Sequence, residues 1–415
     1  MRAAHVVGAG LAGLSAAMVL AEAGFAVTIH EAAPRAGGRC RSYYDAQLGQ
    51  EIDNGNHIVF SGNEAVNRYL ARIGTSDKLS GPAHADFDFH DLGDDTRWTL
   101  KVNDGRFPGW VFDAARRAPG TTIADHLALA RLAVARRQTV IGDIAPTSGL
   151  FWERVVEPML LAVLNCPPAG GSAWLAGRFL MASFARGGAA CRPMVAEPTL
   201  DAAFVDPALA WLAERGVTVN FGARLRSVRL AGEQTAGLDF GAGEVDVSEA
   251  QVIFAVPPNV VSALVPAIPV PDAFCAILNA HFAIEPPRGA PPVTALIHST
   301  AQWVLCHPGR VSVTVSGADD LIDQGREELA ARLWSDVQAT LGITAPLPAW
   351  QVVKEKRATF AATPAQDAKR PAAKTRWRNL FLAGDWTQTR LPATIEGAIQ
   401  SGETAARLAS AHLRR

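Results

Sequence analysis

Three glycines near the N-terminus have the spacing of an anion-binding turn. Gly8, Gly10 and Gly13 form the pattern G-x-G-x-x-G, between an apolar stretch at 5–7 and a helical run at 14–23. In such a turn the first glycine allows the tight bend, the second lets the backbone approach a pyrophosphate, and the third lets the helix pack closely on the strand. The helix N-terminus also offers free N–H groups to phosphate oxygens. The pattern predicts a dinucleotide-binding site.

An acidic residue follows where a ribose would lie. Alternating apolar residues at 25–29 predict a second strand, and Glu31 stands at its end. A carboxylate there accepts hydrogen bonds from ribose hydroxyls and disfavours a 2′-phosphate. The βαβ unit therefore predicts NAD or FAD rather than NADP, and by itself it does not separate these two.

The elements that must position this turn fall into three separated pieces. Alternating strand and helix patterns predict one nucleotide-binding domain built from 1–75, 205–265 and 370–415. The inserts at 76–204 and 266–369 then form a second, α+β domain for the substrate. The predicted fold class is α/β, with a Rossmann-like domain assembled from three chain segments.

Hydrophobic periodicity places the other elements. Helices are expected at 64–73, 122–137, 150–164, 173–184, 206–214, 324–341 and from 394 to 413, and strands at 86–89, 98–100, 217–230, 250–256, 293–297, 303–315 and 350–355. Pro158 should kink or restart the helix that contains it. The proline-rich stretch 266–292 is expected to be irregular.

Composition narrows the class of protein. The chain has 415 residues, a net charge of −1 and only 19% charged residues, which argues against a nucleic-acid-binding protein. The sequence contains no apolar run long enough for a membrane span, and a first strand this close to the N-terminus predicts that there is no signal peptide. Five cysteines without a C-x-x-C pair suit reduced thiols and a cytoplasmic protein. The dispersed histidines predict no metal site.

A second glycine pair follows the acidic residue. Gly37, Gly38 and Arg39 extend the nucleotide motif beyond what a simple NAD domain needs. This segment resembles the GG-R segment of the flavin-dependent amine oxidase and phytoene desaturase superfamily. The resemblance implies FAD as the cofactor, with Gly38 and Arg39 as FAD contacts.

The C-terminal segment carries a second cofactor signal. Gly384 and Asp385 follow a buried strand, where a carboxylate can bind ribityl or pyrophosphate-side hydroxyls. A new helix starts at Thr394 and Ile395, and its free N–H groups can stabilise negative charge on the pyrimidine edge of a reduced flavin.

The superfamily resemblance assigns three further positions. It places the backbone of Val219 against the adenine, and it places Gly55, Asn56 and His57 beside the isoalloxazine. It also argues against an amine oxidase, because those enzymes keep a lysine in the substrate domain and an aromatic wall before the last helix. This chain has no lysine from 102 to 353, and Thr394 occupies the position of the wall.

Longer motifs narrow the resemblance further. The chain is similar to the hydroxysqualene dehydroxylases of bacterial hopanoid synthesis, through the segments DNGNH (53–57), LNCPP (164–168), GDWT (384–387) and LPATIEGA (391–398). Cys166 stands where that family usually has threonine. The resemblance implies a reductive dehydroxylation: hydroxysqualene loses its allylic hydroxyl as water, and reduced FAD delivers hydride to give squalene. It also implies a deep apolar channel, an electron donor and a proton donor.

His57 is the candidate proton donor, since histidine donates near neutral pH. The alternative is that His57 only orients the flavin or the backbone. Asp53 is interpreted as an anchor of its loop, and Trp386 as a cavity wall or a packing residue.

The apolar helices at 151–164 and 173–184 suggest a channel mouth that contacts a membrane, although such faces also form ordinary cores. Three rival functions stay open: an oxidative carotenoid-type desaturase that needs an electron acceptor, an amine oxidase, and a non-catalytic flavin or lipid carrier.

Overall fold

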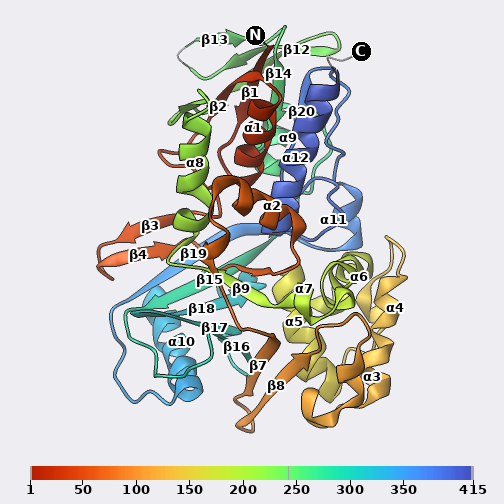
Figure 1. Ribbon diagram of the computed structural model, residues 1–415, viewed down its shortest axis with the longest axis vertical. Helices are drawn as coiled ribbons and strands as arrows, with labels where there is room; N and C mark the ends of the chain where they lie inside the picture. The colour runs from red at the N-terminus through yellow and green to blue at the C-terminus, as the bar shows by residue number, and fades with distance from the viewer. Residues whose placement is uncertain (1, 242, 413–415) are drawn as a thin grey trace.

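A parallel sheet forms the upper half of the molecule (Figure 1). The computed structural model describes residues 2–241 and 243–412. The five strands follow the order β10-β2-β1-β14-β20, and all neighbours are parallel. Their bounds are β1 (Arg2–Val7), β2 (Phe25–His30), β10 (Thr218–Asn220), β14 (Gln251–Phe254) and β20 (Leu380–Leu382). Every residue of β14 and β20 is buried, as expected for parallel strands that are covered on both faces.

Two helices pack together against this sheet. They are α1 (Leu11–Glu22) and α12 (Ile395–His412), from opposite ends of the chain. A Cβ at Gly402 would lie 2.1 Å from the carbonyl oxygen of Ala12, so glycine permits this close approach. The helices α2 (Glu64–Ile73), α8 (Asp206–Ala213) and α9 (Pro258–Leu264) belong to the same half.

The lower half contains a seven-stranded sheet with the order β19-β15-β18-β17-β16-β7-β8. Its neighbours are antiparallel except for the parallel pair of β16 and β7. The strands are β7 (Ala85–Asp91), β8 (Thr96–Val102), β15 (Phe274–Phe282), β16 (Val293–Ile297), β17 (Trp303–His307), β18 (Arg310–Ser316) and β19 (Trp350–Phe360). Helix α10 (Arg326–Leu341) packs its buried Leu329, Leu333 and Val337 against this sheet.

Short helices form a lobe beside this sheet. They are α3 (Ile123–Ala128), α4 (Ala130–Ala133), α5 (Glu157–Leu164), α6 (Ala173–Ala182) and α7 (Gly188–Cys191). The prediction for Pro158 is confirmed: residues 152–156 form a π-helical turn, and α5 restarts at Glu157 with the proline in its first turn. No helix of the described part of the chain is long and apolar enough to cross a membrane.

The remaining elements are short. They are β3 (Ser42–Asp45), β4 (Gln50–Asp53), β5 (Ile58–Phe60), β6 (Leu79–Ser80), β9 (Pro193–Ala196), β11 (Ser227–Ala231), β12 (Gln234–Asp239), β13 (Glu244–Asp246) and α11 (Pro364–Ala368).

The α/β fold class is confirmed, but three local predictions were wrong. The stretch 266–292 is not irregular throughout, because residues 274–282 form the long strand β15, between β18 and β19. The prolines of 266–292 all lie outside this strand, but their number led to the prediction of an irregular segment despite the apolar run FCAILNAHF. The predicted strand 217–230 is two strands in different sheets, and 303–315 is a hairpin that turns at Pro308 and Gly309.

The predicted boundaries of the two domains stay a prediction. Residue 1 and residues 413–415, where the predicted cofactor domain and its last helix end, lie outside the described residues.

Candidate active site

A cavity of about 1140 Å³ is lined by residues of both sheets. From the upper half it receives the turn after β1, the end of β2 and the start of α12. From the lower half it receives side chains of β15, β17, β18 and β19. Small-molecule sites usually measure about 300–1,000 Å³. The cavity is therefore large enough for a dinucleotide together with part of a second ligand.

The glycine turn closes one wall of this cavity. Gly8 has φ = +107°, and its N–H donates to the carbonyl of His30 at 2.8 Å. A Cβ at Gly13 would lie 1.9 Å from the carbonyl oxygen of Gly8, so this position requires glycine for helix–strand packing. A Cβ at Gly10 would meet nothing closer than 3.9 Å and would occupy the space at the start of α1. The structure thus separates a packing glycine from a glycine that keeps a ligand site open.

Glu31 holds the loops beside this turn. Its carboxylate accepts hydrogen bonds from the N–H of Ala9 at 2.7 Å and of Ala33 at 2.8 Å, and the residue lines the cavity. The carbonyl of Glu31 accepts the N–H of Ala223, which brings the segment after β10 to the same place.

The adenine contact of Val219 stays a prediction. Val219 pairs with Ile29 inside β10, and it is not among the residues that line the cavity. Ala223, Arg224 and Leu225 line the cavity instead. The strand ends at Asn220, and the chain reaches the cavity only after the turn at 221–222.

The second glycine pair joins the N-terminal motif to the C-terminal one. A Cβ at Gly38 would lie 3.3 Å from the Cα of Gly10. Next to it, Arg39 donates to the Asp385 carboxylate at 2.6 Å and to the carbonyl of Ala358. All four of the predicted contacts Gly10, Gly38, Arg39 and Asp385 line the cavity.

A buried arginine shapes the loop that carries Asp385. Arg370 is 1% exposed and donates to the carbonyls of Asp385 and Thr387 and to the hydroxyl of Thr389. Nothing in its local sequence indicates this role. Gly384, which precedes the loop, has φ = +140° and donates its N–H to Ser401 at 2.7 Å.

The start of α12 provides a second helix N-terminus at the cavity. Thr394 caps this helix by accepting the N–H of Gly397 at 3.0 Å, and Ile395 is its first residue. The Glu396 carboxylate points toward α2, where it accepts hydrogen bonds from the backbone N–H groups of Ala65 and Val66. Burial raises the pKa of Glu396, and both N–H groups oppose this rise. The glutamate of the LPATIEGA motif is thus a capping residue between two helices.

These features fit FAD. Two helix N-termini, those of α1 and α12, face one elongated cavity, and their first-turn N–H groups have no carbonyl partner within the helix. The carboxylates of Glu31 and Asp385 line the same cavity, where hydroxyl groups of a nucleotide need acceptors. Within the described residues, no group of three or more metal-binding side chains is found.

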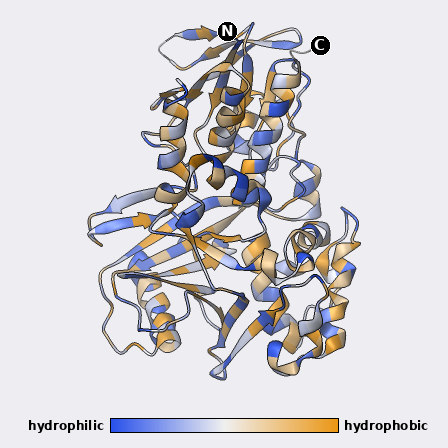
Figure 2. Ribbon diagram, viewed as in Figure 1, coloured by the Kyte–Doolittle hydropathy of each residue, from blue (hydrophilic) through white to orange (hydrophobic). Residues whose placement is uncertain are grey.

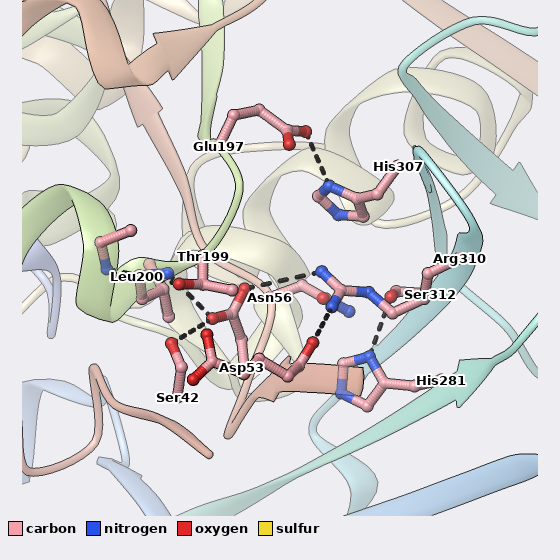
Figure 3. A network of polar contacts seen from close by, with 12 residues as sticks. Ser42, Asp53, Asn56, Glu197, Thr199, Leu200, His281, His307, Arg310 and Ser312 are labelled. Atoms are coloured by element: carbon pink, nitrogen blue, oxygen red, sulfur yellow. Dashed lines mark hydrogen bonds and ion pairs between the residues drawn. The ribbon is translucent and has the colours of Figure 1, made fainter. Parts of the chain in front are cut away.

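A buried polar network anchors the loop that bears His57 (Figure 3). Asp53 accepts hydrogen bonds from the Ser42 hydroxyl at 2.6 Å and from the Leu200 N–H at 2.9 Å. Arg310, itself 3% exposed, lies 3.9 Å from the other Asp53 oxygen. The geometry agrees with the interpretation of Asp53 as an anchor.

His57 itself lines the cavity, as do Gly55 and Asn56. Burial lowers the pKa of its imidazole below the ordinary 6.5; the Asp53 carboxylate raises this pKa, and Arg39 lowers it. The neutral imidazole therefore predominates at neutral pH.

Apolar side chains line the part of the cavity formed by the lower half. They are Phe60, Phe87, Met159, Phe179, Trp303 and Leu305. Polar side chains also line this part of the cavity, and among them Asn279 and Thr314 lie on neighbouring strands and belong to no motif predicted from the sequence. Asn279 is 1% exposed and bonds to Thr314 across two strands. Finding it from sequence would have required the strand β15 and its register.

Comparison with known proteins places the chain in a family. Residues 11–410 match the family of flavin-containing amine oxidoreductases. A hydroxysqualene dehydroxylase of Rhodopseudomonas palustris is 50% identical over 406 residues, which cover 97% of each chain. Another, from Zymomonas mobilis, is 45% identical and covers 99% of this chain and all of its own.

The chain belongs to the hydroxysqualene dehydroxylase family. This family lies within the flavin-containing amine oxidoreductases, so the protein is an FAD-dependent oxidoreductase, as the motifs predicted. Among solved structures, cyclohexylamine oxidase from Brevibacterium oxydans is similar with a TM-score of 0.76 at 14% identity, and each chain is covered completely. This likeness confirms the amine oxidase-type fold of the hydroxysqualene dehydroxylase family member described here.

Proposed function

We propose that the protein removes the hydroxyl group of hydroxysqualene and forms squalene. The observation that carries this proposal is one continuous cavity that joins a dinucleotide site to an apolar region, in a chain similar over its full length to hydroxysqualene dehydroxylases. An isoprenoid alcohol has one polar group on a long apolar chain. A cavity with aromatic walls and a few polar groups suits such a substrate.

The reaction is balanced as a reduction. The C–O bond of the allylic alcohol breaks, a C–H bond forms at the same carbon, and the hydroxyl leaves as water after it gains a proton. When bound, reduced FAD supplies the hydride and is left oxidised. An electron donor must then reduce it again, and we propose a separate donor for this step.

His57 is the proposed proton donor to the leaving hydroxyl. It lines the cavity, and Asp53 anchors its loop through two short hydrogen bonds. Burial lowers the pKa of His57, so only a minority of the protein carries the protonated imidazole at neutral pH. For the same reason the protonated imidazole gives up its proton more readily than a free one. The apolar walls limit the access of water, which would otherwise compete with the hydride for the allylic carbon.

The proposed FAD contacts share one property: each lies on the cavity wall or shapes it. They are Gly8, Gly10, Gly13, Glu31, Gly38, Arg39, Gly55, Asn56, Gly384, Asp385, Thr394 and Ile395. Val219 is kept as the proposed adenine contact, because the chain that follows it lines the cavity from Ala223 to Leu225. We also propose the two-domain division at 1–75, 205–265 and 370–415 against 76–204 and 266–369, because the five-stranded and the seven-stranded sheet each take all their strands from one of these groups. A small sheet, β5-β9-β6, joins the two groups.

Contact with a membrane surface is a further part of this proposal. The two helical segments first considered for it pack mostly inward: Leu160, Leu164 and Leu175 are buried, and Phe179 lines the cavity. Exposed apolar side chains gather instead between residues 107 and 150. They are Phe107, Phe112, Ile123, Leu127, Val134 and Leu150, and Figure 2 shows hydrophobic segments in this lobe.

The membrane contact is tested by sedimentation with vesicles of phosphatidylglycerol. Phe107 is 72% exposed and Val134 is 82% exposed, so Phe107→Ser with Val134→Ser should weaken binding without unfolding the protein. Wild-type protein that stays in the supernatant would rule the contact out.

The function is tested with the purified FAD-loaded protein, reduced by dithionite without oxygen and mixed with hydroxysqualene. Squalene in the extract supports the dehydroxylase. An amine oxidase would instead release peroxide from amines in air, and a desaturase would bleach its oxidised flavin with a polyene precursor.

A further inference from the structure

Two neighbouring strands place an asparagine and a threonine side by side in the cavity. Asn279 on β15 and Thr314 on β18 are directly paired across the antiparallel register. The Thr314 hydroxyl donates to Asn279 Oδ1 at 2.8 Å, and Asn56 Nδ2 donates to the Thr314 oxygen at 3.0 Å. Both side chains line the cavity and are at least nine-tenths buried.

These bonds fix the orientation of the Asn279 amide. The backbone N–H of Asn56 lies 3.3 Å from Oδ1, and a backbone N–H can only donate. The atom that faces it is therefore the oxygen, which leaves Nδ2 on the opposite side. Within the described residues, Nδ2 has no hydrogen-bond acceptor. Because Asn279 lies on the cavity wall, a ligand in the cavity can supply this acceptor.

Two nitrogens converge on the space that Gly55 leaves open. A Cβ at Gly55 would lie 3.3 Å from Asn279 Nδ2 and 3.8 Å from His57 Nε2. Both nitrogens thus face one small region at the polar end of an apolar cavity. A hydroxyl oxygen fits such a region, because it accepts two hydrogen bonds.

We propose that Asn279 binds the hydroxyl group of the substrate, donating a hydrogen bond from Nδ2 to the oxygen that leaves as water. Thr314 is a positioning residue, because it holds the amide in the donating orientation. This inference rests on the proposed function and adds the group that recognises an alcohol rather than a hydrocarbon. It also favours release of the product, because squalene lacks the oxygen and cannot form this hydrogen bond.

The same two strands contain an internal control. His281 and Ser312 are paired two residues further along the same register and are joined by a hydrogen bond of 2.8 Å. Both are completely buried, and neither lines the cavity. Figure 3 shows the two side chains and the hydrogen bond between them. Ser312→Ala therefore removes a comparable cross-strand bond without touching the substrate space.

The test compares two ligands on the oxidised, FAD-loaded protein. Hydroxysqualene and squalene are titrated separately, in detergent micelles, and the change in the flavin spectrum gives each Kd. Wild-type protein should bind the alcohol more tightly than the hydrocarbon. Asn279→Leu should weaken binding of the alcohol about tenfold and leave the Kd of squalene unchanged, the size expected for one lost hydrogen bond.

Thr314→Val serves as the second variant if Asn279→Leu does not fold. It keeps the shape of the side chain and frees the amide to turn, so the preference for the alcohol should fall by a smaller factor. Ser312→Ala should keep the wild-type preference. Equal preference for the alcohol in wild type and Asn279→Leu would overturn the inference, as would wild-type protein that binds both ligands alike.

Failure of the proposed function is a separate outcome. If wild-type protein with reduced flavin prefers the alcohol but forms no squalene, Asn279 still binds the hydroxyl and the assigned reaction is wrong. If wild type forms squalene and Asn279→Leu does so at the same rate and with the same preference, the reaction stands and Asn279 has no part in it.

Discussion

The guanidinium of Arg39 lies 2.6 Å from the carboxylate of Asp385, a residue 346 positions later in the chain. This ion pair joins the glycine-rich segment that follows β2 to the loop that follows β20, and both residues line the cavity. Two motifs that are each weak alone are thus in contact at the cofactor site.

Arg39→Ala should weaken FAD binding about fivefold, which corresponds to about 1 kcal/mol. A hydrogen bond to a charged group contributes about 1.5–3 kcal/mol when buried. The Arg39 side chain is 43% exposed, so solvent reduces this contribution. Fluorescence titration of the apoprotein with FAD measures the change. Arg229→Ala, which removes the exposed pair with Glu244, should leave FAD affinity at the wild-type value.

Gly10→Ala should lower FAD affinity, whereas Gly13→Ala should lower the stability of the apoprotein. Gly10 has an ordinary φ of −73° and an open space at its Cβ, so its alanine variant should keep the apoprotein Tm within about 2 °C. It should lose FAD affinity at least about tenfold, since the methyl group occupies the approach to α1.

Gly13→Ala should instead lower the stability of the apoprotein by about 3 kcal/mol, because its Cβ would overlap the Gly8 carbonyl. Thermal melts of both apoproteins measure the difference. Normal FAD binding by Gly10→Ala would show that the dinucleotide does not pass this glycine.

The rate of squalene formation should fall as the pH rises. Burial lowers the pKa of His57 below 6.5, and only the protonated imidazole donates, so the single-turnover rate should be highest at acidic pH and decline through an inflection below 6.5. His57→Gln should lower the rate about 10²–10⁴-fold and remove this inflection.

The exposed His84 supplies the control, and His84→Gln should keep both the rate and the pH profile. If His57→Gln keeps the inflection, another group supplies the proton and His57 only orients its surroundings.

Asp53→Asn should destabilise the apoprotein by roughly 3 kcal/mol, since the buried Arg310 would lose the carboxylate 3.9 Å away. Chemical denaturation measures the free energy of unfolding. The exposed pair of Asp323 and Lys356 gives the matched control, and Asp323→Asn should change this free energy by less than about 0.5 kcal/mol. If both substitutions change the free energy of unfolding equally, Asp53 does not anchor its loop.

The cofactor site was predictable because its signals are local. Gly8, Gly10, Gly13 and Glu31 lie within one βαβ unit, whose residue spacing reflects its geometry. The strand predicted over 217–230 was wrong because the periodicity hides the turn at 221–222, after which the chain reaches the cavity.

The polar groups of the substrate region were not predictable in this way. Asn279 gains its partner Thr314 only through the pairing of β15 with β18, and flanking prolines masked β15 itself. Arg370 contacts Asp385, Thr387 and Thr389, which lie 15 to 19 residues later in the chain, beyond β20. Buried polar side chains of this kind have no periodic pattern, because their partners are set by tertiary packing.

In the proposed reaction, hydride from reduced FAD replaces the hydroxyl of the substrate. The most direct test reduces the FAD-loaded protein without oxygen in D₂O and mixes it with one equivalent of hydroxysqualene. The account predicts one squalene per flavin reoxidised, with one deuterium at the carbon that carried the hydroxyl. Flavin that stays reduced while the alcohol is recovered unchanged, or squalene without the deuterium, would contradict it.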